Sequence, residues 1–235
     1  MRNQYSDLLE IQARIPAGDA VLDGDLMIPS GAGGMVLFAH GSGSSRHSPR
    51  NRSVARVILE AGLGALLFDL LTREEESVDV FTRRLRFDIE LLTARLIEAT
   101  NWVAGQGLTQ NLPIGYFGSS TGAAAALMAA ASLGERIGAV VSRGGRPDLA
   151  GDAASLVTAP TLLIVGGHDE TVIELNQEAY ARLRCEKELR IVPGATHLFE
   201  EPGALEQVAN LAAQWFKNHL QTLPTQVKSA GGAQR

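Results

Sequence analysis

The pentapeptide Gly118-Ser119-Ser120-Thr121-Gly122 stands between a short apolar run and a long alanine-rich stretch. The run Leu112–Phe117 is typical of a buried strand, and the stretch that begins at Ala123 is typical of a buried helix. A G-x-S-x-G sequence between a strand and a helix indicates a nucleophile elbow, a tight turn that lifts the serine hydroxyl clear of the backbone. The unpaired N–H groups of the helix start favour negative charge beside Ser120. Taken alone, these residues fit a flexible Gly/Ser turn equally well, so the rest of the chain has to decide.

Strands and helices are expected to alternate along the chain after an antiparallel hairpin. The expected strands are 8–15, 20–28, 35–39, 64–69, 112–117, 137–141, 160–165 and 187–192, and the expected helices are 49–61, 81–103, 123–133, 172–184 and 204–220. Residues 73–76 are interpreted as an acidic loop. This pattern predicts a mostly parallel α/β sheet with helices on both faces. We expect one domain over residues 1–221 and a flexible tail over 222–235.

Candidate catalytic residues fall in loops that follow predicted strands, which is where the active residues of such sheets collect. An acyl-transfer serine needs a base to take its proton and an acid to orient that base. Ser120 is therefore predicted to be the nucleophile, His197 the base and Asp169 the orienting acid. Glu170 and Asp148 are competing acids, and Asp169 has a helix N-cap as an alternative role.

A second loop made of small residues, His40-Gly41-Ser42-Gly43, follows another predicted strand. The backbone N–H groups of Ser42 and Thr121 are predicted to form an oxyanion hole, because bulkier side chains there would block the substrate carbonyl. His40 and Gly41 are also candidates for substrate binding. His40 is interpreted as a residue that holds the loop rather than as a second base.

Arginines follow two of these strands: Arg46, Arg50 and Arg52 come after the small-residue loop, and Arg143 and Arg146 come after the sixth strand. A guanidinium beside a catalytic serine can bind a carboxylate or phosphate of the substrate with two hydrogen bonds. We assign Arg46, Arg143 and Arg146 to substrate binding on this ground. Salt bridges with nearby acidic residues are the alternative.

Four motifs in this chain together resemble the α/β-hydrolase fold, and within it the dienelactone-hydrolase-like group. They are Phe38–Gly43, Gly118–Gly122, Gly166–Asp169 and Gly194–His197. The chain order of nucleophile, acid and base is also that of the fold. The resemblance spans about residues 20–220 and implies an eight-stranded sheet and hydrolysis through an acyl-enzyme. Dienelactone hydrolases proper carry a cysteine nucleophile where this chain has Ser120, which favours a serine carboxylesterase over a lactone hydrolase.

The segment between the sixth and seventh predicted strands, residues 142–159, is too short for a large cap. We therefore expect an open site that takes small esters with short acyl chains. Lactone, thioester and short-peptide hydrolysis on the same triad remain alternatives. A non-catalytic binding or regulatory protein on a hydrolase scaffold is the alternative from another class.

Composition argues against several other functions. A net charge of −5 gives no reason to expect binding to nucleic acid, and no apolar run approaches the length of a membrane span. No secretory signal is recognised and Cys185 is the only cysteine, so a cytoplasmic protein without a disulfide is expected. The five histidines have no metal-binding spacing and no nucleotide-binding loop is present, so we expect no metal and no cofactor. The oligomeric state stays open, a homodimer included.

Overall fold

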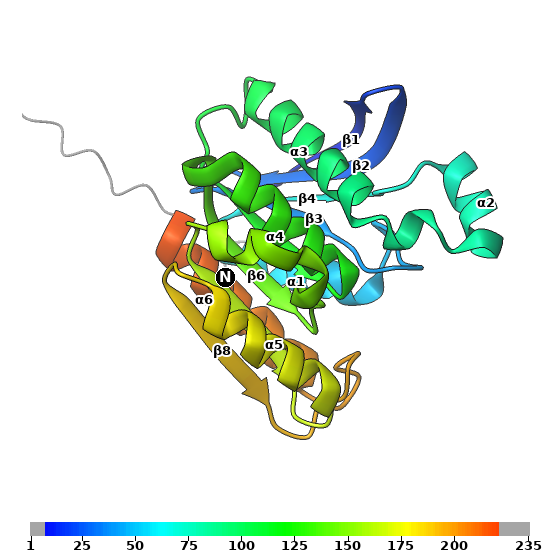
Figure 1. The fold of residues 1–235 in the computed structure, drawn as a ribbon. Helices are drawn as coiled ribbons and strands as arrows, with labels where there is room; N and C mark the ends of the chain where they lie inside the picture. Colours follow the sequence, from blue (N-terminus) through cyan, green and yellow to red (C-terminus); the bar gives the residue numbers. More distant parts are fainter. Residues whose placement is uncertain (1–7, 221–235) are drawn as a thin grey trace, which may run out of the picture.

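A computed structural model describes residues 8–220 as an eight-stranded sheet between two layers of helices (Figure 1). The strands are β1 (Leu8–Ala17), β2 (Ala20–Pro29), β3 (Met35–Ala39), β4 (Gly64–Phe68), β5 (Ile114–Ser119), β6 (Ile137–Arg143), β7 (Thr161–Gly166) and β8 (Lys187–Val192). Their order in the sheet is β1-β2-β4-β3-β5-β6-β7-β8. The pairs β1–β2 and β2–β4 are antiparallel, and the remaining pairs are parallel. The predicted α/β-hydrolase sheet with its antiparallel start is confirmed; the predicted tail, 222–235, lies outside the described residues.

The helices form one layer on each face of the sheet. They are α1 (Pro49–Glu60), α2 (Arg73–Thr82), α3 (Ile89–Gly105), α4 (Thr121–Leu133), α5 (Glu170–Arg182) and α6 (Ala204–Leu220), with short 3-10 segments η1 (Leu85–Phe87), η2 (Gly134–Arg136) and η3 (Pro147–Leu156). The α3–α4 layer packs on one hydrophobic core and the α1–α6 layer on another (Figure 1). Among the described residues, no helix is long and apolar enough to cross a bilayer.

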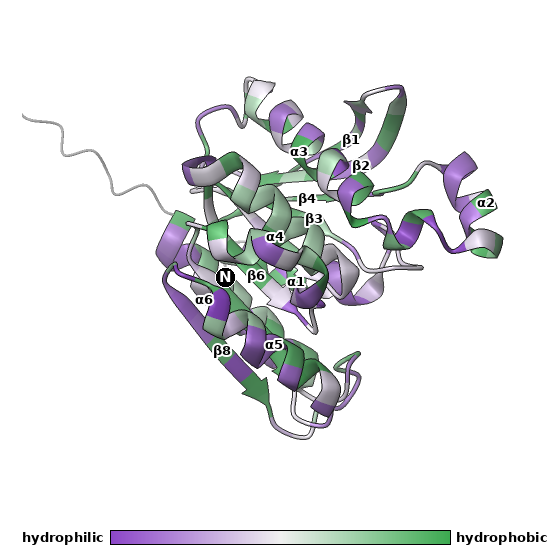
Figure 2. Ribbon diagram, viewed as in Figure 1, coloured by the Kyte–Doolittle hydropathy of each residue, from purple (hydrophilic) through white to green (hydrophobic). Residues whose placement is uncertain are grey.

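The central strands are buried along their whole length, as expected of strands covered on both faces. Every residue of β3, β4, β5 and β7 is buried. Figure 2 shows the contrast at the sheet edge, where most of β8 is hydrophilic. Its sequence begins Lys187-Glu188, and charged side chains of this kind discourage a free edge from pairing with another chain.

The stretch between β4 and α3 corrects the sequence prediction. Residues 73–76 are not a loop but the first turn of α2, which a reciprocal capping box between Thr72 and Glu75 begins. Arg83 ends this helix in the left-handed region, at φ 55°. The buried carboxylate of Asp79 accepts the N–H groups of the turn that follows, and Asp88 then caps α3. The single helix predicted over 81–103 is therefore wrong at residues 83–88, which separate the end of α2 from the start of α3, because these local caps outweigh the apolar period.

Candidate active site

The turn between β5 and α4 has the geometry of a nucleophile elbow. Ser120 lies at φ 50° and ψ −121°, a strained conformation for a residue with a side chain. The flanking glycines are sterically required, since a Cβ on Gly118 would lie 2.4 Å from the Cα of Ala123. A Cβ on Gly122 would lie 2.1 Å from the carbonyl oxygen of Ala39. The packing of β3, β5 and α4 thus forces the serine out of the regular backbone path.

Backbone hydrogen bonds fix Ser120 against the loop that follows β6. Its N–H donates to the carbonyl of Arg143 at 3.2 Å, and its carbonyl accepts the N–H of Arg146 at 3.1 Å. Within residues 8–220, the Ser120 hydroxyl forms no hydrogen bond to another side chain or to the backbone. Catalytic hydrogen bonds are often absent or long before substrate binds, and the hydroxyl is available here to donate to a base.

His197 and Asp169 are brought together from two separate loops. The Nδ1 atom of His197, in the turn after β8, lies 2.6 Å from Oδ2 of Asp169, which follows β7. The Asp169 side chain is 16% exposed and that of His197 is 39% exposed, so the acid is the less accessible partner of a histidine that reaches solvent. Asp169 holds the N-cap position of α5, but its side chain makes no capping hydrogen bond. Its competitor Asp148 is instead bound by Arg146.

Gly144 connects the two halves of the candidate triad. It directly follows Arg143, whose carbonyl binds the N–H of Ser120. A Cβ on Gly144 would lie 3.4 Å from the imidazole of His197, and its φ of 49° is in the left-handed region. The loop after β6 therefore runs from Ser120 to His197 through a left-handed residue, which favours glycine, and a Cβ there would lie tightly, at 3.2 Å, against the carbonyl oxygen of His197.

The small-residue loop after β3 packs directly against the elbow. A Cβ on Gly41 would lie 3.1 Å from the Cβ of Ser120. The N–H of Ser42 donates to Oγ1 of Thr121 at 2.9 Å, which ties the loop to the first turn of α4. The N–H of Thr121 belongs to that first turn, where N–H groups have no intrahelical acceptor. The two predicted oxyanion donors are thus neighbours of Ser120, although the Ser42 N–H is bound to the Thr121 hydroxyl in this structure.

His40 holds the loop. Its side chain is buried, its Nδ1 donates to the carbonyl of Gly41 at 3.0 Å, and its Nε2 accepts the N–H of Leu70 at 3.0 Å. Burial lowers the pKa of His40, so the imidazole is neutral, as this pair of bonds requires. Because both ring nitrogens have backbone partners, the geometry supports the loop-holding interpretation of His40 and not a direct contact with substrate.

The sequence profile of the dienelactone hydrolase family matches residues 22–226. The chain belongs to the dienelactone hydrolase family. A crystal structure of dienelactone hydrolase from Anabaena variabilis is 57% identical, with a TM-score of 0.90 over 92% of this chain and 100% of the other. A cold-adapted esterase from an Arctic intertidal metagenomic library shares the fold at 17% identity, with a TM-score of 0.73 over 93% of this chain and 97% of the other.

A longer relative is also similar to this member of the dienelactone hydrolase family. A Mycobacterium tuberculosis protein named "Putative phosphoribosyl transferase" is 58% identical over 213 residues, which are 91% of this chain and 47% of that protein. The chain thus spans about half the length of that curated relative. The printed name therefore refers to a protein in which about half of the sequence lies outside the matched region.

The cysteine that serves as nucleophile in dienelactone hydrolases proper has no counterpart at the elbow of this family member. Cys185 follows α5, and its thiol lies 3.7 Å from Oγ1 of Thr161, at the start of β7. Since parallel strands carry their active residues at the opposite end, Cys185 lies away from the elbow. Ser120 is the nucleophile candidate that the geometry provides.

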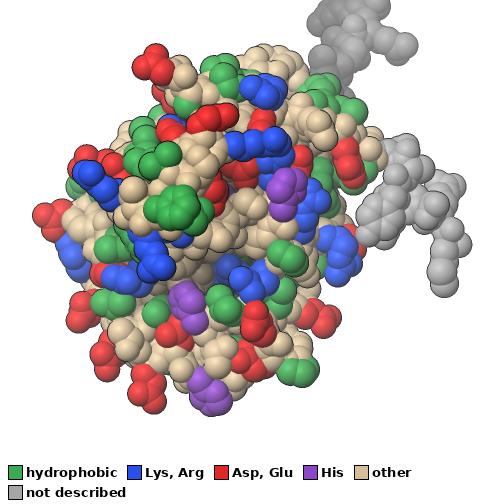
Figure 3. All heavy atoms as spheres, turned by 90° about the vertical axis from the view of Figure 1, so that its right-hand side faces the viewer, with side chains coloured by type: hydrophobic (Ala, Val, Ile, Leu, Met, Phe, Trp, Pro, Cys, Tyr) green, Lys and Arg blue, Asp and Glu red, His purple; other side chains and the backbone are tan. Residues whose placement is uncertain are grey.

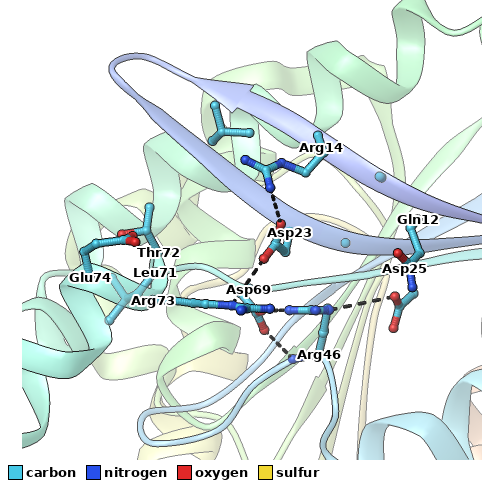
Figure 4. A pocket seen from close by; sticks show the side chains of 13 residues that line it. Gln12, Arg14, Asp23, Asp25, Arg46, Asp69, Leu71, Thr72, Arg73 and Glu74 are labelled. Atoms are coloured by element: carbon cyan, nitrogen blue, oxygen red, sulfur yellow. Dashed lines mark hydrogen bonds and ion pairs between the residues drawn. The ribbon is translucent and has the colours of Figure 1, made fainter.

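Two of the three arginines assigned to substrate binding are held by carboxylates, which is the alternative that the sequence left open. Arg46 lies between Asp69 and Asp25 beside a cavity of about 520 Å³ (Figure 4), and no triad residue lines that cavity. Arg146 binds both carboxylate oxygens of Asp148, at 2.8 and 2.7 Å. This pairing raises the pKa of Arg146 and lowers the pKa of Asp148.

Arg143 differs from the other two. It is 8% exposed, and no carboxylate of residues 8–220 forms an ion pair with it. Burial, and to a smaller extent the positive charge of another arginine, Arg50, lowers the pKa of Arg143 to about 10. The side of the molecule where α2 lies shows basic and histidine side chains around a shallow hollow (Figure 3). Arg50, the second residue of α1, was not among the assigned binding residues, although it follows the same small-residue loop as Arg46.

Proposed function

We propose that this chain is a serine hydrolase that cleaves small carboxylic esters through an acyl-enzyme intermediate. In this mechanism Ser120 attacks the ester carbonyl while Nε2 of His197 takes its proton. Asp169 holds the Nδ1–H of His197 and stabilises the imidazolium that forms. His197 then protonates the leaving alcohol, and a water activated by the same histidine hydrolyses the acyl-enzyme.

The observation that carries the proposal is the 2.6 Å hydrogen bond between His197 and Asp169, at the edge of the sheet where Ser120 occupies the strained elbow. These three residues come from loops after β8, β7 and β5, far apart in sequence. If the Gly/Ser turn were merely structural, there would be no reason for a half-buried carboxylate to orient a solvent-reaching histidine at the same edge of the sheet. Membership of a hydrolase family supports the same reading.

The oxyanion donors in this proposal are the N–H groups of Thr121 and Ser42. The Thr121 N–H points from the first turn of α4, whose dipole favours negative charge. To bind the substrate oxygen, the Ser42 N–H would have to turn away from the Thr121 hydroxyl or donate to both oxygens at once. Between β6 and β7 only the 3-10 segment η3 (Pro147–Leu156) is inserted, which leaves the site open and favours short acyl groups.

Hydrolysis of a lactone is the second candidate, because the 57% identical crystal structure carries the name dienelactone hydrolase. A lactone is a cyclic ester, and the same triad would open it. The phosphoribosyl transferase name belongs to a relative twice as long, so we do not extend a transferase activity to this chain. We propose a small-molecule substrate, with no need for a metal or cofactor in any step.

The test is hydrolysis of p-nitrophenyl acetate, butyrate and octanoate by the wild type, Ser120→Ala and Ser132→Ala. Ser132 is exposed on the same helix, α4, and serves as the matched serine control. We expect activity that falls with chain length, is retained in Ser132→Ala and disappears in Ser120→Ala. A fluorophosphonate probe should label Ser120 alone, as mapped by peptide mass spectrometry. Activity that survives in Ser120→Ala would remove the elbow from the mechanism.

A further inference from the structure

A buried arginine without a counter-ion is an unusual feature that the triad chemistry does not use. The Nε and Nη1 atoms of Arg143 are both buried and have no hydrogen-bond partner. Buried charged groups in proteins are nearly always paired, because leaving a charge unpaired away from water is costly. The described part of the chain supplies no carboxylate to Arg143, so the partner is expected to be a ligand.

The direction of the Arg143 side chain follows from the alternation along β6. Val141, two residues earlier, packs in the core shared with α1 and α6, whereas the Ser142 side chain faces Gly145 and α4. Arg143 therefore points to the α1 side of the sheet. The Arg143 carbonyl binds the N–H of Ser120, and Arg143 pairs with Ser119 in the sheet, so the side chain starts from a backbone position beside the elbow.

The first turn of α1 faces Arg143 from the other side. Arg50, the second residue of α1, has a buried Nε without a partner, while its Nη1 binds Oε1 of Glu200 at 2.8 Å. Asn51 anchors this turn, because its Oδ1 accepts a hydrogen bond from the hydroxyl of Ser119, the neighbour of Ser120, at 3.2 Å. Two guanidinium groups and the positive end of a helix dipole are thus fixed beside the elbow.

We propose that Arg143, Arg50 and the first turn of α1 form a subsite that binds a phosphate group carried by the ester substrate. This assignment deepens the proposed function and rests on it, since the phosphate is a recognition group and the ester remains the bond that is cleaved. Formation of the acyl-enzyme releases the alcohol and its hydrolysis by water releases the acid. Either product can carry the phosphate, which itself is unchanged.

The number of unsatisfied donors favours phosphate over carboxylate. Three buried nitrogen atoms have no acceptor for their N–H bonds: Nε and Nη1 of Arg143 and Nε of Arg50. A phosphate monoester offers three strong acceptor oxygens and a charge near −2, whereas a carboxylate offers two oxygens and a single charge. Glu200, the present partner of Arg50, is 65% exposed, so water screens its charge and its pair is easily exchanged.

The first experiment measures binding of inorganic phosphate to the full chain by calorimetry, independently of any hydrolysis. The variants are Arg143→Gln, Arg50→Gln and the control Arg182→Gln, whose arginine pairs with Asp152 on an exposed surface. We expect saturable phosphate binding that weakens at least ~10-fold in both test variants and is unchanged in the control. Arg50→Gln keeps the test decisive if the variant at Arg143 does not fold.

Three results would overturn the subsite: no saturable binding to the wild type, binding to Arg143→Gln and Arg50→Gln that is as tight as to the wild type, or acetate binding as tightly as phosphate. The last would make the site a carboxylate subsite. The second experiment compares kcat/KM for 2-acetoxyethyl phosphate and for 2-methoxyethyl acetate. Arg143→Gln should lower the ratio of the two by at least ~10-fold through KM. Phosphate binding without any ester hydrolysis would sink the proposed function and leave the subsite standing.

Discussion

Replacing Arg143 by methionine should make the protein more stable. Burial, with a contribution from Arg50, lowers the pKa of Arg143 from 12.5 to about 10. Each pKa unit corresponds to ~1.4 kcal/mol, so the folded state carries a cost of about 3 kcal/mol for keeping this charge. Methionine fills a similar volume without the charge, and replacing buried ions by apolar residues commonly stabilises proteins by about 1–4 kcal/mol. We expect a gain of about 1–3 kcal/mol, equivalent to roughly 2–4 °C in Tm for each kcal/mol.

The assay is equilibrium unfolding in urea at pH 8, in a buffer free of phosphate and sulfate so that no anion occupies the site. Arg182→Met is the control, because its arginine forms an exposed pair with Asp152 that should contribute about 0–1 kcal/mol. The pH dependence has a defined sign. A basic group whose folded pKa is lowered destabilises the fold below that pKa, so the wild type should approach the stability of Arg143→Met as the pH rises through about 10.

An Arg143→Met protein that is less stable than Arg182→Met would refute this reasoning. It would mean that Arg143 makes favourable contacts that outweigh its desolvation, and that its charge is compensated within the fold. The fold would then give no reason to expect a bound anion at Arg143. A gain in stability of the expected size, together with lost phosphate binding, would show that the charge is retained for a ligand at the expense of the fold.

Three further predictions concern the triad and its loops. Asp169→Asn should lower kcat/KM for p-nitrophenyl acetate by about 10³–10⁴-fold, because the amide cannot hold His197 in the required tautomer, and a loss below about 10-fold would contradict that role. Gly144→Ala and Gly151→Ala place the same strain on glycines at φ 49° and 55°, but only the first adds a methyl group against His197. Activity should therefore fall about 10–100-fold in Gly144→Ala alone, and equal activities would show that this contact does not matter. Stability in urea should fall between pH 7 and 5.5, because a buried His40 with a lowered pKa binds fewer protons than the unfolded chain. His40→Gln should flatten this dependence, and an unchanged slope would assign it to other groups.

The sequence predicted the elbow and the acid–base pair because their signals are local. A glycine on each side of Ser120 is needed wherever a strand turns sharply into a helix, so the motif carries its own geometry. Asp169 and His197 each follow an apolar strand, and the carboxyl ends of parallel strands share one edge of the sheet. Their 2.6 Å hydrogen bond then follows from topology rather than from any sequence proximity.

Helix α2 and the arginine partners could not be predicted in the same way. The sequence contains the capping box of Thr72 and Glu75, but the prediction followed the apolar residues after it. It therefore began a single helix at residue 81 and missed α2. Arg95 also binds Glu75, at 2.6 Å, and this long-range contact fixes the start of α2 against α3. Which arginines form ion pairs also depends on the tertiary structure, because Arg46 binds Asp25 of β2 and Asp69 at the end of β4.

Two energetically costly features of the fold occupy neighbouring strand ends. Ser120 is strained at the end of β5, and Arg143 is buried without a counter-ion at the end of β6, joined to Ser120 by a backbone hydrogen bond. Elsewhere the charge of a similar residue is paired, as that of Arg46 is by two aspartates. Sequences tend to break local rules where function requires it, and independent violations rarely coincide by chance in a well-packed core. Because β5 and β6 are paired directly, one ligand can contact both ends, so strain at the serine and uncompensated charge at the arginine point to a single substrate bound across them.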